Sequence, residues 1–365
     1  MFFPILILEG RMYYRNDVAL EESQAVIKVF NPLQFVKIVG GHPQIDFFWK
    51  EVGGKRRLIG NPNKPMRKLH DLFGAYIRDG IEIMGDGNYP LHKLPSSTGF
   101  VKGSNPLKNA QKHQEGKFFY VTDIWNAYPS VDIERLAALI VYIMKYNEYK
   151  VDFSLSRLGQ NATLVEELRN DALFSSVHGL LESFFSGIRG EGLAVGGPLS
   201  PFLFNLYCEV YADAELRLVC RKYGIIFTRY ADDNVFSRNK PIIGKIRKEL
   251  RECITRAGFR INHRKSKVLS RAMGTVFVTK IGLQDPSATE SGSRTATLVF
   301  PQKKRRLLHG IIGSYLTMQM DWPEKVSGFI AEFLYYFKNV KEPTATDRKT
   351  FALCKKFEEE WAKHH

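Results

Sequence analysis

The stretch Thr228-Arg229-Tyr230-Ala231-Asp232-Asp233-Asn234-Val235-Phe236-Ser237 places two adjacent acids between two runs that are rich in β-branched and aromatic residues. Such runs favour β-strands, and a short acidic pair between them signals a turn, so we expect a hairpin with carboxylates at its tip. Neighbouring carboxylates repel each other unless a cation binds them, and Mg2+ is usually held by one or two carboxylates together with substrate phosphates. Taken alone, the pair is also typical of a solvated surface turn.

The charge balance of the whole chain indicates a polyanionic partner. Its 365 residues include 53 lysines and arginines against 38 aspartates and glutamates, a formal net charge of +15. A surplus of this size favours nucleic acid over a membrane surface. Four widely spaced cysteines without a CxxC pair argue against a disulfide framework or a zinc site and predict a cytoplasmic location. The apolar residues 1–8 are few and include a proline, so we expect a packed strand or loop there and no signal peptide.

A third acid lies at the end of another β-prone run. Residues 117–132 read Lys-Phe-Phe-Tyr-Val-Thr-Asp-Ile-Trp-Asn-Ala-Tyr-Pro-Ser-Val-Asp, which predicts a buried strand that reaches Asp123 and a helix that begins near Asp132. Ligand sites in α/β folds often use side chains at this end of a strand. An isolated aspartate in such a place is also typical of a helix cap or a turn, and both interpretations remain open for Asp123 alone.

A glycine-rich loop separates the two acidic segments. Residues 192–201 read Gly-Leu-Ala-Val-Gly-Gly-Pro-Leu-Ser-Pro and precede a predicted helix at 202–219. A flexible loop that opens a helix can approach a sugar or a phosphate closely. Within that helix, Tyr211-Ala212-Asp213 repeats the letters of Tyr230-Ala231-Asp232, and we interpret it as a chance repeat without a role in the site.

Basic segments lie on both sides of the acidic ones. Residues 53–65 predict a basic strand between two turns, which suits a phosphate ligand and equally suits an edge strand guarded by charges. Residues 277–283 predict one further strand, and residues 285–293 a polar linker. A run of four basic residues opens the first of three helices expected at about 304–319, 323–338 and 346–363. These helices can form a solvated cap or a clamp on a nucleic-acid backbone.

The three aspartates form one pattern along the sequence. Asp123 and the pair Asp232-Asp233 lie about 110 residues apart, on predicted strands with a glycine loop and a helix between them. Three acids that converge in this way can hold two metal ions, of which one activates an attacking hydroxyl while the other stabilises a leaving pyrophosphate.

In sequence order, four motifs resemble those of the reverse transcriptase family. They read Asp-Ile-Trp-Asn-Ala-Tyr-Pro-Ser-Val at 123–131, Gly-Gly-Pro-Leu-Ser-Pro at 196–201, Tyr-Ala-Asp-Asp at 230–233 and Gly-Phe-Arg-Ile-Asn-His-Arg-Lys-Ser at 258–266. The resemblance implies an α+β right-hand polymerase. It implies an N-terminal region and fingers at 1–118, a palm at 119–284 with inserted fingers helices at about 133–190, and a linker with a helical thumb at 285–365.

The resemblance also implies roles for particular residues. Asp123, Asp232 and Asp233 would bind two Mg2+ ions, with Mn2+ as the alternative ion, and Lys265 would protonate pyrophosphate. Tyr128, five residues after Asp123, falls at the family's steric gate against a ribose 2′-hydroxyl. The residues implied to meet the deoxynucleotide triphosphate are Lys55, Arg57, Asn126, Ala127, Tyr128 and Gly196.

Within the family, the tract 99–104 and the signature Asn109-Ala110-Gln111-Lys112-His113 resemble retron reverse transcriptases. Two departures accompany this resemblance. Retron enzymes carry Val-Thr-Gly where this chain has Val278-Thr279-Lys280, and the family's Pro-Gln-Gly is replaced by residues 194–196, Ala-Val-Gly.

A retron enzyme would use a structured noncoding RNA as template and primer, start from a 2′-hydroxyl and yield branched multicopy single-stranded DNA. It would act in antiphage defence with a separate effector protein and without a membrane partner. The residues expected to bind the RNA are Asn109, His113, Lys303, Lys304, Arg305 and Arg306.

Two other functions remain open. The chain can be another bacterial defence or group II intron-related reverse transcriptase, including one that extends DNA without a template. It can also be an inactive RNA-binding scaffold, although the complete set of acids and the tyrosine argue against lost activity.

Overall fold

The computed structural model of the chain describes residues 5–8, 11–14, 39–52, 54–84, 95–149, 163–188, 190–285, 295–318 and 323–364. Its strands are β1 (Ile5–Leu8), β2 (Arg11–Tyr14), β3 (Ile45–Val52), β4 (Lys55–Pro62), β5 (Phe118–Trp125), β6 (Ile226–Tyr230), β7 (Asp233–Arg238), β8 (Arg260–Ile261), β9 (Lys267–Ser270), β10 (Val276–Val278), β11 (Ile281–Gln284) and β12 (Thr297–Val299).

The helices divide into an N-terminal and central group and a C-terminal group. The first group comprises α3 (Lys64–Met84), α4 (Pro106–Gln111), α5 (Ile133–Tyr149), α7 (Thr163–Leu168), α8 (Ala172–Phe184), α9 (Ser200–Cys208), the π-helix η2 (Glu209–Asp213), α10 (Ala214–Tyr223), α11 (Gly244–Arg256) and the 3-10 helix η3 (Arg271–Met273). The second comprises α12 (Gln302–Met318), α13 (Pro323–Asn339) and α14 (Ala345–His364). Within the described ranges, every helix is too short or too polar to cross a lipid bilayer.

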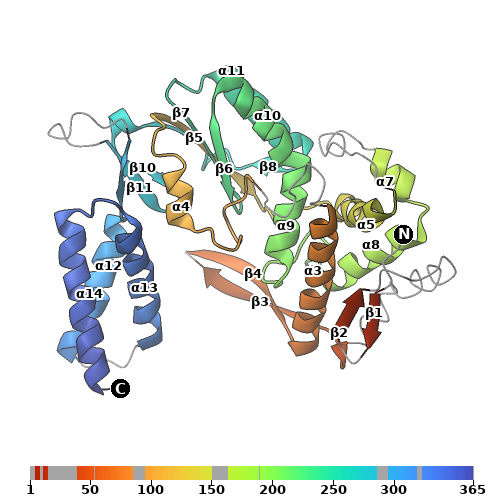
Figure 1. The fold of residues 1–365 in the computed structure, drawn as a ribbon, viewed down its shortest axis with the longest axis horizontal. Coiled ribbons are helices and arrows are strands. Elements are labelled where there is room, and N and C mark those ends of the chain that lie inside the picture. The colour runs from red at the N-terminus through yellow and green to blue at the C-terminus, as the bar shows by residue number, and fades with distance from the viewer. Residues whose placement is uncertain are drawn as a thin grey trace.

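A five-stranded antiparallel sheet lies at the centre of the molecule, with β5 in its interior (Figure 1). Strand β5 pairs with β7 on one side, and on the other side it pairs with β9 along its first half and with β8 along its second. The sequence of β5 explains this place, because its run of apolar residues leaves few positions that suit solvent.

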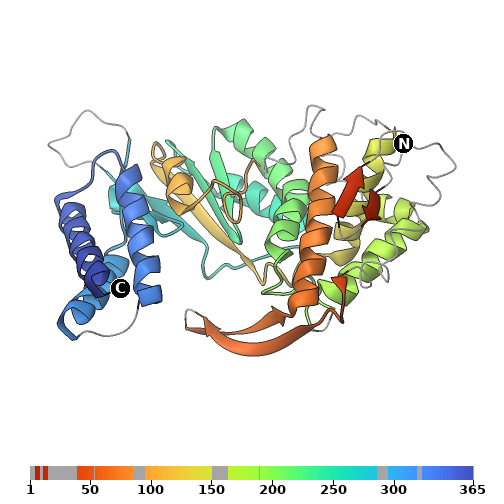
Figure 2. The ribbon, with the colours of Figure 1, turned by 60° about the horizontal axis from the view of Figure 1, so that its bottom comes forward.

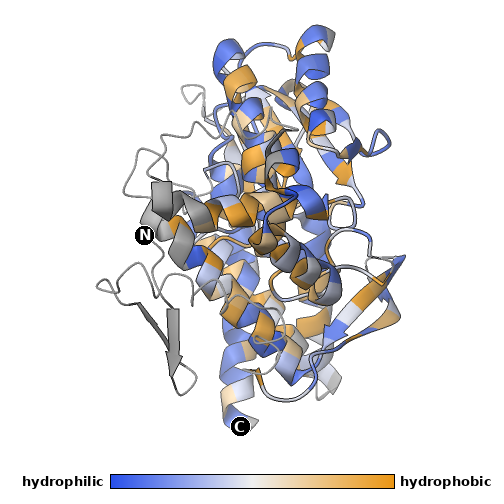
Figure 3. Cartoon of the chain, turned by 90° about the vertical axis from the view of Figure 1, so that its right-hand side faces the viewer, coloured by the Kyte–Doolittle hydropathy of each residue, from blue (hydrophilic) through white to orange (hydrophobic). Residues whose placement is uncertain are grey.

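The two faces of the sheet are buried in different cores. Successive strand side chains point to opposite faces. Accordingly, Tyr120 and Phe236 stack on each other in the larger core, which also contains α9, α10 and α11. Phe119 and Val235 belong to a second core, which contains β10–β12 and the C-terminal helices. Figure 3 shows apolar residues concentrated toward the middle of the molecule.

Two groups of elements lie at opposite ends of the sheet. Figure 2 shows α3 and the helices α5 and α8 at one end and the bundle α12–α14 at the other, with the β3–β4 hairpin projecting below. The bundle is joined internally by Asp347, which is fully buried and accepts hydrogen bonds from Arg305 at 2.5 Å and from the backbone of Thr344 at 3.0 Å. The three C-terminal helices therefore occur where the sequence predicts them, and the α+β class is confirmed.

One strand prediction is wrong. Residues 277–283 form two strands and not one, because β10 and β11 are antiparallel partners joined at Thr279 and Lys280. Both turn residues have positive φ, 44° and 73°. Neither is a glycine, so the sequence lacks the usual signal of such a turn. The predicted linker at 285–293 lies, except for Asp285, outside the described residues.

Candidate functional site

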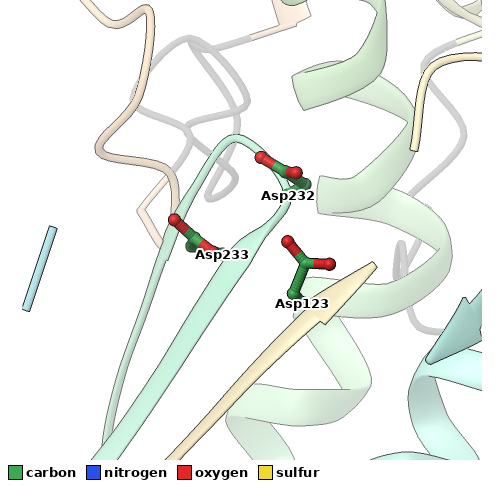
Figure 4. Close-up of side chains that lie close together, drawn as sticks. All are labelled: Asp123, Asp232 and Asp233. Atoms are coloured by element: carbon green, nitrogen blue, oxygen red, sulfur yellow. The ribbon is translucent and has the colours of Figure 1, made fainter. Parts of the chain in front are cut away.

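Three acids meet at one end of the central sheet. The β5–β7 register places Asp123 opposite Asp233, and Asp232 lies in the turn that leads into β7. The backbone N–H of Ile124 donates to the Asp232 carbonyl at 3.0 Å, which ties the turn to β5. One carboxylate oxygen from each acid lies within 4.8 Å of the others. Figure 4 shows the three side chains gathered at the tip of β5 and the turn between β6 and β7.

Burial and mutual repulsion make the ionised acids costly. Burial, followed by the charges of Asp232 and Asp123, raises the pKa of Asp233 to about 6. Burial and Asp123 also raise the pKa of Asp232. Asp123 has two compensating partners, since Lys265 Nζ lies 2.5 Å from its Oδ2 and Asn262 Nδ2 donates to its Oδ1 at 3.0 Å. Opposite charge is therefore needed at this site.

The donor set suits a divalent hard cation. All the candidate ligands are carboxylate oxygens, which are the donors that Mg2+ and Mn2+ take in proteins. Lys265 brings one positive charge to three carboxylates, so it cannot neutralise the ionised cluster alone. A divalent ion held by Asp123, Asp232 and Asp233 would do so.

Tyr128 lies close to this cluster and is firmly supported. Its ring packs against Phe204, with centroids 5.1 Å apart, and its carbonyl accepts from the backbone N–H of Leu193 at 2.8 Å. Burial, followed by the charge of Asp232, raises the pKa of Tyr128 to about 12, so the phenol stays neutral. The preceding Asn126 has φ of 48°, which turns the chain sharply between β5 and Tyr128.

The glycine-rich loop contacts the backbone of β4. Gly60 N–H donates to the Val195 carbonyl at 2.7 Å. Gly196 has φ of 100°, and a Cβ there would lie 2.4 Å from the Gly60 carbonyl oxygen. A side chain at Gly196 is therefore excluded, and the loop fastens the β3–β4 hairpin to the rest of the site. Lys55 and Arg57 are exposed on that hairpin, and neither forms an ion pair within the described part of the chain.

Asn109 and His113 are not exposed for RNA contact. Both are fully buried. The His113 ring lies 2.7 Å from both Thr228 Oγ1 and Ser237 Oγ, and burial lowers its pKa to about 3, so it bridges β6 and β7 as a neutral ring. Asn109 Nδ2 donates to Thr279 Oγ1 at 3.1 Å. The expectation that these side chains touch RNA is wrong, because they occupy the interior.

The basic run at the start of α12 is split by its ion pairs. Lys304 pairs with Glu332, and Arg305 pairs with the buried Asp347. Lys303 and Arg306 are exposed. Lys304 and Arg305 thus hold the bundle together, and contact of the exposed Lys303 and Arg306 with a nucleic-acid backbone stays a prediction.

Sequence reasoning missed two residues of the site. Asn262, a direct partner of Asp123, stands three residues before Lys265 within a quoted motif, and its amide could have been noticed there. Arg229 directly precedes the Tyr-Ala-Asp-Asp motif and forms a buried ion pair with Asp213 at 2.8 Å. The tripeptide that ends at Asp213 does lie in a helical segment, as expected, but it is not without a role.

Comparison with known proteins gives one family. The profile of the family described as "Reverse transcriptase (RNA-dependent DNA polymerase)" matches residues 49–308. Retron Ec83 reverse transcriptase of Escherichia coli is 26% identical over 284 residues, with 74% of this chain and 81% of that protein covered. Retron Mx162 reverse transcriptase of Myxococcus xanthus is 28% identical over 232 residues, with 59% and 42% covered. Retron Mx65 reverse transcriptase of the same organism is 27% identical over 240 residues, with 64% of this chain and 51% of that protein covered. The match thus spans about half the length of the two Myxococcus proteins.

Solved structures are similar at low identity. Telomerase from Candida albicans, in complex with a fragment of telomeric RNA, is 13% identical with a TM-score of 0.47, covering 93% of this chain and 63% of that one. The RNA-dependent RNA polymerase of a human picobirnavirus is 9% identical with a TM-score of 0.42, and the match covers 86% of this chain and 57% of that one.

Removal of one crowded charge is expected to stabilise the metal-free protein. Since the pKa of Asp233 is raised from 3.8 to about 6, its ionised form costs the fold free energy. Asp233→Asn should raise the melting temperature in EDTA by about 2–5 °C. The gain should be full above pH 6 and disappear toward pH 4, and Mg2+ should stabilise the variant less than the wild type.

The measurement is thermal unfolding with EDTA or with Mg2+ across this pH range. Asp71→Asn, at an exposed position on α3, is the matched control and should leave the melting temperature unchanged. A lower melting temperature for Asp233→Asn in EDTA would contradict the crowding of charges described above.

Proposed function

The chain belongs to the reverse transcriptase family of RNA-dependent DNA polymerases, and we propose that it adds deoxynucleotides to a primer hydroxyl by a two-metal reaction at Asp123, Asp232 and Asp233. The observation that carries this proposal is the approach of one oxygen from each acid to within 4.8 Å of the others, at the end of an antiparallel sheet. Burial, followed by the neighbouring acids, disfavours the ionised form of Asp233, and a divalent cation bound with substrate phosphates would offset that cost.

Each protein group has a distinct task in this reaction. The three acids would hold Mg2+, which when bound activates the attacking hydroxyl and stabilises the leaving pyrophosphate. Lys265 keeps its ammonium group beside Asp123 Oδ2, where it can donate a proton to the pyrophosphate. Asn262 fixes the orientation of the Asp123 carboxylate through the amide hydrogen bond to Oδ1.

We assign the nucleotide site to the surroundings of Tyr128. The tyrosine would meet the sugar and exclude a 2′-hydroxyl, because its ring is fixed against Phe204 and its backbone against Leu193. The triphosphate would be contacted by the backbone amides of Asn126 and Ala127 and by the exposed backbone of Gly196. Lys55 and Arg57 are exposed on β4, and their positive side chains would contact the triphosphate from the β3–β4 hairpin.

Similarity to retron reverse transcriptases supports a narrower proposal about the partner. The template and primer would be a structured noncoding RNA and the product multicopy single-stranded DNA, made for antiphage defence in the cytoplasm with a separate effector protein. Lys303 and Arg306 would contact the nucleic-acid backbone from α12. The proposed division is a fingers region at 1–118, a palm at 119–284 and a thumb region at 285–365.

Loss of the acid pair is expected to abolish synthesis. Asp232→Asn combined with Asp233→Asn should lower Mg2+-dependent incorporation of deoxynucleotides on a primed RNA by at least about a thousandfold, since two of three ligands for the metal are lost. The control is Asp71→Asn, which should retain full activity. Undiminished incorporation by the double variant would refute the assignment, and salt-dependent RNA binding by an inactive wild type would favour the scaffold function.

A smaller residue at the sugar site is expected to relax selectivity. Tyr128→Ala should raise incorporation of ribonucleotides relative to deoxynucleotides by about tenfold or more, because removal of the ring opens space beside the 2′-carbon. This ratio is measured by steady-state incorporation of a ribonucleotide and of the deoxynucleotide with the same base on one primed RNA. Tyr128→Phe keeps the ring and should keep the wild-type ratio, whereas an unchanged ratio for Tyr128→Ala would place the gate elsewhere.

Nucleic acid that copurifies with the protein distinguishes the retron function from its relatives. Sequencing of that nucleic acid is expected to give a branched RNA–DNA product with one defined RNA. Untemplated DNA or long repeats would instead favour the alternative of another defence or intron-related reverse transcriptase.

A further inference from the structure

Arg229 is a fully buried arginine directly beneath the metal-binding turn. Only 1% of its side chain is exposed. Its Nε and Nη2 donate to the Asp213 carboxylate at 3.0 and 2.8 Å. Its Nη1 donates to Asn205 Oδ1 at 2.8 Å and to the Ala231 carbonyl at 3.1 Å. The guanidinium group therefore joins a helix to the residue that precedes Asp232.

Burial of this arginine requires partners for its charge and for its donors. A buried guanidinium group is strongly destabilising unless a carboxylate and further acceptors satisfy its donors. Asp213 supplies the charge, while Asn205 and Ala231 supply the remaining acceptors. Because the guanidinium group is planar and its donors form a rigid fork, the positions of these acceptors determine one another.

The turn itself needs such support. Ala231 has φ of 54°, a left-handed conformation that is unfavourable for a residue with a Cβ. Gly99 lies against its other side, where a Cβ would approach Ala231 N to 2.7 Å. Asn205 Nδ2 donates to the Gly99 carbonyl at 2.8 Å. Asn205 thus connects both sides of the turn, one directly and the other through Arg229.

A π-helical segment aligns the two helix residues that hold Arg229. Asn205 and Asp213 are eight residues apart, and at about 100° per residue they would point about 80° apart on a regular α-helix. The π-helix Glu209–Asp213 absorbs one extra residue in this interval. With one of the eight residues taken up by the π-helix, the remaining seven rotate the chain by about 700°, close to two full turns. Asn205 and Asp213 therefore point to the same side of the helix, and both reach the guanidinium group of Arg229.

The same guanidinium group also supports Tyr128. Arg229 Cζ lies 5.3 Å from the ring centroid of Phe204 on one side. The Phe204 ring packs in turn against the Tyr128 ring at 5.1 Å. One buried residue therefore lies beneath both the metal-binding turn and the proposed sugar gate.

We propose that Arg229, held by Asp213 and Asn205, is a positioning residue that fixes the Ala231 carbonyl and thereby the Asp232 carboxylate in the geometry that binds the metal. It contacts neither metal nor substrate and acts only through the turn and through Phe204. This inference rests on the proposed polymerase function, which it extends to residues outside the three acids.

Asn205→Ala is the most direct test. The substitution removes the acceptor for Arg229 Nη1 and the donor to Gly99, and it leaves the ion pair between Arg229 and Asp213 in place. We expect kcat for single-nucleotide incorporation on a primed RNA to fall by about ten- to a hundredfold, as for a small misplacement of a catalytic group. The KM for the deoxynucleotide should change less than about threefold. The Mg2+ concentration at half-maximal rate should rise, with excess Mg2+ restoring part of the rate.

A second variant and a control separate positioning from folding. Arg229→Lys keeps the charge beside Asp213 but has no fork to reach both Asn205 and Ala231, so it should show the same rise in required Mg2+. Glu215→Gln breaks the ion pair between Glu215 on α10 and Arg256 on α11, outside this network, and should leave kcat and the Mg2+ dependence unchanged. The unfolding temperature in EDTA, measured for every variant, identifies one that has lost its fold.

Binding of Mg2+ is also read without catalysis, from the increase in unfolding temperature that Mg2+ produces. A reduced increase for Asn205→Ala or Arg229→Lys, whichever is folded in EDTA, supports the positioning role. Wild-type kcat, Mg2+ dependence and Mg2+-induced stabilisation in a folded variant would overturn it. Should the wild type incorporate no nucleotide at all, the polymerase function fails, while the Mg2+-induced stabilisation still decides whether Arg229 positions the acids.

Discussion

The hydrogen-bonded register between β5 and β7 keeps Asp123 opposite Asp233 although their charges repel. A ladder of backbone hydrogen bonds cannot slip by one residue without moving every side chain of β5 to the opposite face, into the other core. Phe119 and Tyr120, buried in separate cores on the two faces, therefore determine where the acids lie. Packing on both faces of the sheet thus holds the acids together against their repulsion, and a bound divalent cation would relieve that repulsion.

Contacts that allow no Cβ between them join the parts of the molecule around this sheet. The backbones of Gly60 and Gly196 touch, so the β3–β4 hairpin and the glycine-rich loop are positioned together. Gly99 touches Ala231 in a similar way. In each contact one backbone segment rests directly on another, so the position of one segment restricts that of the other without a flexible side chain between them. The geometry around the acids is correspondingly well determined.

Buried polar groups complete the support of the site. His113 bridges the hairpin strands β6 and β7, Asn109 meets the β10–β11 turn through Thr279, and Arg229 holds the turn that carries Asp232. Two of these residues belong to a signature that resembles retron enzymes, and here they connect structural elements within the protein. A residue signature can therefore mark the framework of a site as readily as its binding surface.

The amino-acid sequence by itself determined the types of the elements and the identity of the acids. Alternating and helical spacing are local properties, so the hairpin around Asp232, the strand that carries Asp123 and the three C-terminal helices are all evident from the chain. Burial and pairing depend instead on residues distant in sequence. Only the tertiary structure decided that Asn109 and His113 are interior, that Arg305 pairs with a buried carboxylate and that Asp213 holds Arg229. A charged or polar residue looks the same in a sequence whether water or a buried partner satisfies it, and the fold makes that choice.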